Sequence, residues 1–207
     1  SGSNNFTVLL GNGSGGFTAN APVSTGSGSS PRAVVVGRFN ADSRDDLAIA
    51  NFSSRTITVF TGNGSGGFTS GSTTYLFSNP QALVAGKFNS DAHWDLATAS
   101  GNNNTVTILT GNGSGGFTAG TATTIANAGA GDVGSLAVGN FNGDATDDLV
   151  VVKFLSSQIQ IMLTSATGGL SPANTMTLAS GGTGPSQAMV GSLHDDGFPD
   201  VAVIHDD

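Results

Sequence analysis

The chain has 207 residues, of which 32 are glycine and only 10% are charged, and it contains no cysteine. A chain of this length accommodates one or two domains, and the lack of cysteine excludes a disulfide framework and a thiolate metal site. The net charge of −8 provides no basic patch for phosphate groups, and no apolar run approaches the roughly 18 residues needed to cross a bilayer, so we predict neither nucleic-acid binding nor membrane insertion.

The first predicted element is a β-hairpin near the start of the chain. An apolar run at residues 6–10 leads into the turn Gly-Asn-Gly-Ser-Gly-Gly-Phe at residues 11–17, and the same letters return at residues 62–68 and 111–117. Asn-Gly between two such runs is a strong hairpin signal, because both central residues of a type I′ turn need positive φ. We therefore predict three copies of one hairpin, each closed by a type I′ turn.

Four predicted strands make up each repeating unit. A short apolar run precedes an Asp-rich loop, a second run follows it, a third leads into the Gly-rich turn, and a looser fourth comes after the turn. Four antiparallel strands in about 50 residues are typical of a propeller blade. The predicted fold class is thus all-β, a β-propeller built of four-stranded antiparallel blades.

The Asp-rich loop carries the repeat, with the frame G-x-F-N-x-D-x-x-x-D-L. It occupies residues 37–47, 86–96 and 139–149, and a degenerate copy occupies residues 191–201. Asn40, Asn89, Asn142 and His194 hold equivalent places, at steps of 49, 53 and 52 residues. Such a period is typical of stacked sheet units, so we predict a single propeller body or propeller fragment.

This register also predicts the blade boundaries. Residues 25–78, 79–127 and 128–180 each form a whole blade, residues 1–24 match the two outer strands of another, and residues 181–207 match two inner strands. Each half leaves a bare sheet edge. The halves can meet within one chain as a four-bladed ring or between chains as a homo-oligomer, or the chain can be a piece of a longer propeller. We favour the last two, because a four-bladed ring demands sharp angles between blades.

The loops also present hard oxygen atoms at alternating positions, which calcium requires. Counting from the residue after the glycine, the ligands are side chains at positions 1, 3, 5 and 9 and a carbonyl at 7. The third loop is the better site and the fourth the weaker, since imidazole is a poor calcium ligand. The predicted metal ligands are Asn140, Asn142, Asp144, Thr146 and Asp148 in the third loop, and Ser192, Asp196, Phe198 and Asp200 in the fourth.

In the first two loops, position 1 is Arg38 or Lys87 instead of an oxygen ligand. We predict that Arg38 contacts Asp42 or Asp46, and that Lys87 contacts Asp91 or Asp95, so that a fixed cation replaces calcium. The alternative for all four loops is a metal-free turn whose Asn and Asp side chains bond their own backbone.

The frame, followed by a strand and the Gly-rich turn, resembles the FG-GAP or VCBS-type repeat of integrin α-subunit propellers, many bacterial surface and secreted proteins, and some fungal lectins. The resemblance implies a calcium-binding propeller used for recognition or scaffolding. That family normally has Asp at position 1, where this chain has Arg38, Lys87, Asn140 and Ser192.

Catalytic motifs are absent from the sequence, because its three histidines are scattered and no G-x-S-x-G elbow occurs. We therefore predict no enzyme, but a secreted or cell-surface recognition and adhesion module whose partner is an extracellular protein or a glycan. The alternatives are a passive calcium-stabilised spacer in a larger surface protein, or a lectin. Trp94 and Tyr75 are candidates for stacking on a sugar ring, although Trp94 is more readily explained by packing.

Overall fold

The computed structural model describes residues 3–206, and within them every regular element is a β-strand. The strands are β1 Asn5–Phe6, β2 Leu9–Gly11, β3 Phe17–Ala19, β4 Val23–Ser24, β5 Pro31–Gly37, β6 Asp46–Asn51, β7 Thr56–Gly62, β8 Phe68–Tyr75, β9 Ala82–Gly86, β10 Asp95–Ser100, β11 Thr105–Gly111, β12 Phe117–Ala119, β13 Thr123–Thr124, β14 Val133–Gly139, β15 Asp148–Lys153, β16 Gln158–Thr164, β17 Leu170–Ala179, β18 Pro185–Gly191 and β19 Asp200–His205.

Three large antiparallel sheets form the body of the molecule. The first sheet runs in the order β5-β6-β7-β8, and the third runs β14-β15-β16-β17. The second sheet runs β9-β10-β11-β12, and β13 also pairs with β11. Consecutive strands are therefore neighbours, as in a propeller blade, and the predicted all-β propeller fold is confirmed.

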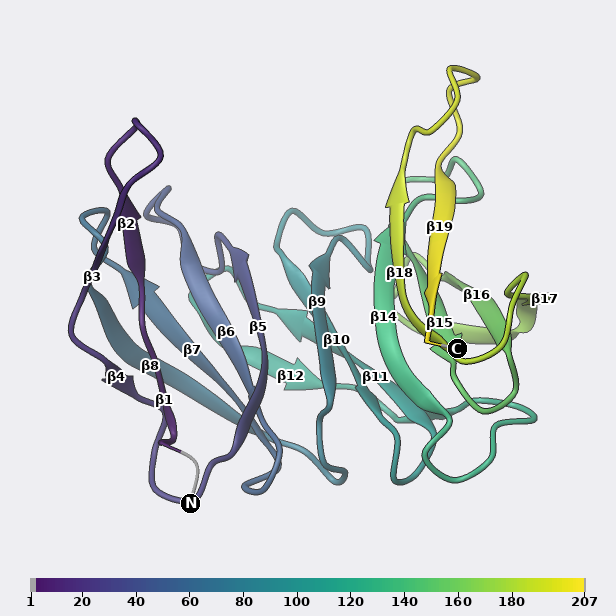
Figure 1. Cartoon of the computed structure of the whole chain (residues 1–207), viewed down its shortest axis with the longest axis horizontal. Helices are drawn as coiled ribbons and strands as arrows, with labels where there is room; N and C mark the ends of the chain where they lie inside the picture. Colours follow the sequence, from purple (N-terminus) through teal and green to yellow (C-terminus); the bar gives the residue numbers. More distant parts are fainter. Residues whose placement is uncertain (1–2, 207) are drawn as a thin grey trace.

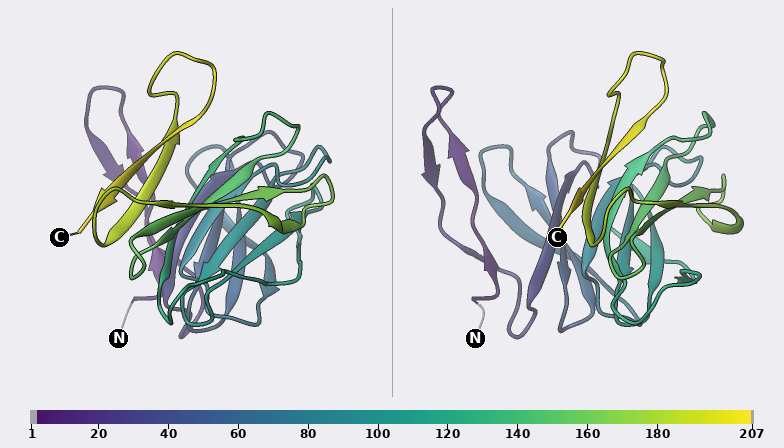
Figure 2. Two further views of the ribbon diagram at one scale, coloured as in Figure 1. Left: turned by 90° about the vertical axis from the view of Figure 1, so that its right-hand side faces the viewer. Right: turned by 45° about the vertical axis from the view of Figure 1, so that its right-hand side comes forward.

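The remaining strands form two-stranded sheets at the two ends of the molecule. β2 pairs with β3 and β1 with β4, while β18 pairs with β19. We call β2–β3 the N-terminal hairpin and β18–β19 the C-terminal hairpin. Figure 1 shows the sheets side by side in chain order, with these hairpins at opposite ends, and Figure 2 shows that the row of sheets curves as an open arc.

The core lies between adjacent sheets. The second strand of each large sheet is buried along its whole length, as the nearly unbroken apolar runs require. Phe39, Ile57 and Val59 of the first sheet and its loop pack on Leu83 and Leu96 of the second. Equivalent clusters join the second sheet to the third and the third to the C-terminal hairpin.

The Gly-rich turns close hairpins as predicted, but their geometry differs from a type I′ turn. Positive φ falls on Gly13 and Gly15 and on their equivalents in the other copies, and the asparagine is not among the residues with positive φ. The Asn12 Oδ1 instead accepts hydrogen bonds from the amides of Ser14 and Gly16 at 2.9 and 3.0 Å. The asparagine side chain thus closes a longer turn, because it substitutes for a backbone carbonyl.

Candidate functional site

The last aspartate of each of the first three Asp-rich loops joins the loop to the third strand of its sheet. Asp95 Oδ2 accepts from the Phe88 amide at 3.0 Å, and its Oδ1 accepts from the Gly111 amide at 2.9 Å. Asp46 and Asp148 make the same two bonds in their sheets. All three side chains are fully buried. Position 9 therefore has a structural role whether or not a metal is present.

Burial has an electrostatic cost at two of these positions. Burial raises the pKa of Asp95, against the opposing effect of the amides that donate to it. Burial likewise raises the pKa of Asp148, although the Thr164 and Phe141 amides lower it. A carboxylate is disfavoured where water is excluded. The hydrogen bonds thus compensate only part of the desolvation.

The third loop gathers its predicted ligands around Asp144. Asp144 Oδ1 accepts from both the amide and the hydroxyl of Thr146 at 2.7 Å, and its Oδ2 accepts from Asn142 Nδ2 at 2.7 Å. These bonds, led by the Thr146 amide, lower the pKa of Asp144. Asn140 Nδ2 donates to the Asp144 carbonyl. The structure thus brings Asn140, Asn142, Asp144 and Thr146 together on one loop, in which the Thr146 side chain is buried.

The fit of calcium to this loop depends on its oxygen atoms. Asn140 Oδ1 and Asn142 Oδ1 each accept a backbone amide of the loop. Asp144 bonds groups of its own loop, whereas Asp147 accepts the Lys87 amide of the second loop and Asp148 accepts the Thr164 amide of β16. Among residues 3–206 no group of three or more His, Asp or Glu side chains has a metal-binding arrangement. Hard oxygens of the kind that calcium takes are nevertheless present, so calcium stays a prediction here.

The fourth loop places its histidine between two carboxylates. His194 Nε2 lies 2.9 Å from Asp196 Oδ2, and its Nδ1 lies 3.0 Å from Asp200 Oδ1. The His194 and Leu193 amides, followed by the imidazole, lower the pKa of Asp200. Ser192 Oγ donates to the His194 carbonyl, and the Phe198 amide donates to Asp196. The imidazole therefore stands where a cation bound to this loop would lie.

The cations in the first two loops do not make the predicted ion pairs. Arg38 Nε lies 3.3 Å from Asp45, an exposed residue, and not from Asp42 or Asp46. Lys87 Nζ donates to the carbonyl of Ala92 within its own loop. The predicted partners were wrong because Asp46 is occupied by backbone amides and the other aspartates cap turns. The cations do lie along their own loops.

The aromatic candidates for stacking differ in exposure. Trp94 is 37% exposed, and Lys87 Nζ lies 5.6 Å from the centre of its ring. Tyr75 is 78% exposed at the end of β8, and Phe77 beside it is 94% exposed. Phe77 was not predicted from the sequence as a binding residue, although an aromatic ring this exposed is a feature of binding surfaces.

A groove between the second and third sheets was likewise not predicted from the sequence. The fourth strand of the second sheet is interrupted between β12 and β13, whereas β8 is continuous. In the first sheet the hydroxyls of Thr58 and Thr73 bond across the strands at 3.2 Å. Ala122 replaces Thr73 at the equivalent place. The second sheet therefore has no hydroxyl pair at this place, beside the interruption of its fourth strand.

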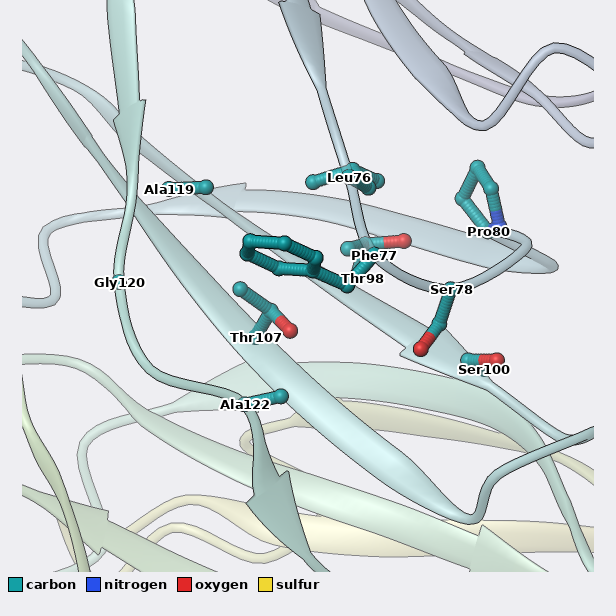
Figure 3. A pocket seen from close by; sticks show the side chains of 10 residues that line it. All are labelled: Leu76, Phe77, Ser78, Pro80, Thr98, Ser100, Thr107, Ala119, Gly120 and Ala122. Carbon is teal, nitrogen blue, oxygen red and sulfur yellow. The ribbon is translucent and has the colours of Figure 1, made fainter.

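The groove has a volume of about 520 Å³ and a hydroxyl-rich lining. Ile108 and Leu170 supply apolar surface, and four threonines supply the hydroxyls: Thr110, Thr121 and Thr123 from the second sheet and Thr167 from the turn before β17. On the other side of the interruption, a small pocket of about 20 Å³ lies beneath Phe77. Figure 3 shows Thr107 and Ala122 near the Phe77 ring, with Ser78 and Ser100 toward Pro80. We call the groove, the pocket and Phe77 together the interrupted-strand site.

Two buried charged residues are structural. Lys153, fully buried, donates from Nζ to the Ala126 carbonyl at 3.2 Å and to Gln158 Oε1 at 3.0 Å. Asp132, also fully buried, accepts the amides of Leu155 and Ser156. Both side chains bond the turn that joins β15 to β16 or its flanks, so they fix that connection.

Comparison with known proteins identifies the fold. A Lactobacillus plantarum protein of solved structure is 18% identical with a TM-score of 0.64, over 82% of this chain and 48% of that one. The Pseudomonas aeruginosa periplasmic gluconolactonase PpgL is 18% identical with a TM-score of 0.57, over 89% and 45%. An Agrocybe aegerita lectin that recognises non-reducing terminal N-acetylglucosamine is 18% identical with a TM-score of 0.55, over 85% and 46%. The chain spans about half the length of these structures.

The prediction that the chain is not an enzyme is overturned by these comparisons. The gluconolactonase has the same fold, so a propeller of this kind supports catalysis as well as other roles. Absent catalytic motifs were an insufficient argument, because they describe sites known from other folds.

No curated protein sequence matches the chain. Within residues 3–206 there is no helix with the length and apolarity that crossing a membrane demands. Residues 87–151, which run from the second loop through β10–β14 and the third loop into β15, match the family model for the FG-GAP-like repeat. The resemblance read from the sequence is therefore confirmed, and this segment is an FG-GAP-like repeat.

Proposed function

We propose that the protein is an extracellular recognition module that binds a saccharide at the interrupted-strand site. The observation that carries this proposal is the groove left where β12 and β13 part, lined by threonine hydroxyls, with the exposed Phe77 ring over a small pocket on the opposite side of the same interruption. FG-GAP-like repeats and a lectin of the same fold support a recognition role.

The chemistry of the lining selects the ligand class. A hydroxyl both donates and accepts, so Thr110, Thr121 and Thr123 match the hydroxyl groups of a sugar. Apolar side chains beside them match the C–H face of a sugar ring. The net charge of −8 disfavours acidic saccharides. We therefore propose a neutral or cationic saccharide, such as an amino sugar or its acetylated form.

A glycan array followed by titration calorimetry on the whole chain tests the proposal. The Thr110→Val, Thr121→Val and Thr123→Val triple variant keeps the shape of the groove but removes the three hydroxyls that the second sheet contributes to it. Each lost hydrogen bond costs about 0.5–1.5 kcal/mol, so we expect the affinity for the saccharide to fall at least about tenfold. Phe77→Ala should weaken binding as well, because a saccharide that extends from the groove across the interruption reaches this ring.

The matched control is Thr69→Val, an exposed threonine on β8 outside the groove. It should leave the affinity unchanged. An array with no specific binding, from a chain that remains folded, contradicts the proposal and favours a spacer. Binding that survives both the triple variant and Phe77→Ala places the site elsewhere and also contradicts it.

We further propose that calcium, when present, binds the third loop and stiffens it. Asn140, Asn142, Asp144 and the Thr146 carbonyl would supply its oxygens, beside Asp148. A ligand that binds only the folded state raises the melting temperature. Calcium titration of the chelated protein should therefore release heat and raise Tm, and Asp144→Ala should abolish both effects. No heat and no shift would exclude calcium from this loop.

A further inference from the structure

The two terminal hairpins are complementary halves of one sheet. In the repeat register, Gly11 of β2 corresponds to Gly62 of β7, so the N-terminal hairpin matches the third and fourth strands of a large sheet. Asp200 of β19 corresponds to Asp46 of β6, so the C-terminal hairpin matches the first and second strands. Each hairpin has the strands that the other lacks.

The C-terminal hairpin lacks a hydrogen bond that each large sheet has. In those sheets Oδ1 of the buried aspartate accepts the amide of Gly62, Gly111 or Thr164 on the third strand. Asp200 keeps the equivalent of the other bond, from the Leu193 amide at 2.7 Å. Its Oδ1, with no third strand beside it in the described chain, lies against the His194 ring instead.

Apolar side chains are exposed where the missing half-sheets would lie. Val34 on β5 is 56% exposed, whereas the equivalent Leu83 and Leu136 are 5% and 6% exposed, because another sheet covers each of them. Met189 on β18 is 64% exposed, against 7% for the equivalent Ala137. Val34 is exposed because no preceding sheet covers it, and Met189 is exposed because no following sheet packs on the C-terminal hairpin in the described chain.

Two pockets and an exposed aromatic ring lie where the missing half-sheets would pack. A pocket of about 220 Å³ lies between β1 and β5, beside Phe6 and Val34, where the first strands of a preceding sheet would run. Phe39 of the first loop packs edge-on against Phe117 of the next sheet at 5.4 Å. The equivalent Phe141 lines an apolar pocket of about 340 Å³. Phe17, equivalent to Phe117, is 70% exposed at the other end of the molecule.

We propose that the C-terminal hairpin of one copy of this chain pairs with the N-terminal hairpin of a second copy to form a composite blade. The register of β6 with β7 places Ala202 opposite Val8, because Ala48 lies opposite Val59. The Gly11 amide then donates to Asp200, Phe17 packs on Phe141, and the C-terminal hairpin covers Val34. Bare strand edges pair readily with a matching strand.

A second copy is the occupant because each chain holds its own hairpins apart. The Phe6 ring packs on Phe60 at 5.0 Å, and Asn20 Nδ2 donates to the Gly66 carbonyl at 2.9 Å, which fixes the N-terminal side to the first sheet. The C-terminal hairpin packs on the third sheet, at the far end of the arc (Figures 1 and 2). Such a head-to-tail interface closes when the rotation allows. Two copies give about eight blades, within the propeller range.

Cysteine cross-linking between copies tests this inference, since the chain has no cysteine of its own. Val8→Cys and Ala202→Cys are prepared separately, refolded together and oxidised. We expect a disulfide-linked heterodimer, because opposite residues lie within the roughly 7 Å that a disulfide spans. The control pair is Thr18→Cys with Ala202→Cys, in which Thr18 lies one strand further away on β3 and should not cross-link.

Light scattering gives the second readout. The unmodified chain should have twice the mass of 20.4 kDa, and Val34→Asp should shift it to the monomer while the exposed control Thr69→Asp should not. A monomer in which the double variant Val8→Cys/Ala202→Cys links within one chain overturns the inference. So does a monomer without any cross-link, or a dimer in which the control pair links equally well. These outcomes do not depend on saccharide binding.

Discussion

The buried carboxylate of Asp95 accepts a hydrogen bond at 2.9 Å from the amide of Gly111, the last residue of β11. The bond joins the second loop to a strand that begins well beyond it in the chain, while the other carboxylate oxygen holds the Phe88 amide. The loop and the third strand are thus ordered together by one side chain.

Asp95→Asn tests the importance of this connection. An amide keeps the shape but turns an NH₂ group toward one of the two backbone donors, so one buried amide loses its acceptor. We expect unfolding to become easier by about 1–3 kcal/mol, measured by chemical denaturation. Asp45→Asn, at an exposed position, should stay within about 1 kcal/mol. Equal losses of unfolding free energy in the two variants would show that the buried hydrogen bonds of Asp95 contribute no more to stability than the exposed ion pair of Asp45.

The stabilities of the wild type and of Asp95→Asn should also depend differently on pH. Burial raises the pKa of Asp95 above the ordinary value of 3.8, so the folded state holds this proton more tightly than the unfolded state. The contribution of Asp95 to stability is therefore complete below the unfolded pKa and is lost as pH rises through the folded pKa. The stability difference between wild type and Asp95→Asn should grow as the pH is lowered from 7 toward 4. A difference that shrinks on acidification contradicts the assignment.

Gly111→Ala should damage the same region by a steric route. A Cβ at Gly111 would lie 2.1 Å from the Trp94 carbonyl oxygen, which is backbone and cannot rotate away. Such overpacking typically costs about 1–3 kcal/mol. Gly134→Ala is the matched control, because Gly134 also lies in a strand but its added Cβ would meet nothing within 4 Å. Thermal unfolding should show a lower Tm for the first variant alone.

Lys87→Met should alter the surroundings of the single tryptophan. Lys87 Nζ lies 5.6 Å from the Trp94 ring centre and bonds the Ala92 carbonyl, so its loss removes a cation from the ring. The cost should be about 0.5–1 kcal/mol, as for exposed cation–π pairs. Trp94 fluorescence should change in Lys87→Met and not in Arg38→Met, whose cation pairs with Asp45. Unchanged emission in Lys87→Met would show that the contact is absent in solution.

The sequence predicted the fold because the loop frame and the Gly-rich turn recur in register with strand-forming runs. It did not predict the partner of Arg38, because neighbouring aspartates look alike in sequence, and only the folded backbone shows that Asp46 is engaged by amides. The groove was missed for a related reason. The second sheet has Ala122 where the first sheet has Thr73. This is a small difference in sequence, but the second sheet thereby lacks the hydroxyl pair that joins two strands of the first.

The contacts of each sheet run mainly to the sheet before it and the sheet after it. The stability of the molecule should therefore be the sum of the stabilities of its sheets and of the interfaces between neighbouring sheets, as in repeat proteins. A change in the first sheet reaches the third only through the second, which also holds one wall of the groove. The second sheet thus links the stability of the first sheet to that of the third. Its buried strand β10 should be the last to exchange its amide hydrogens with solvent.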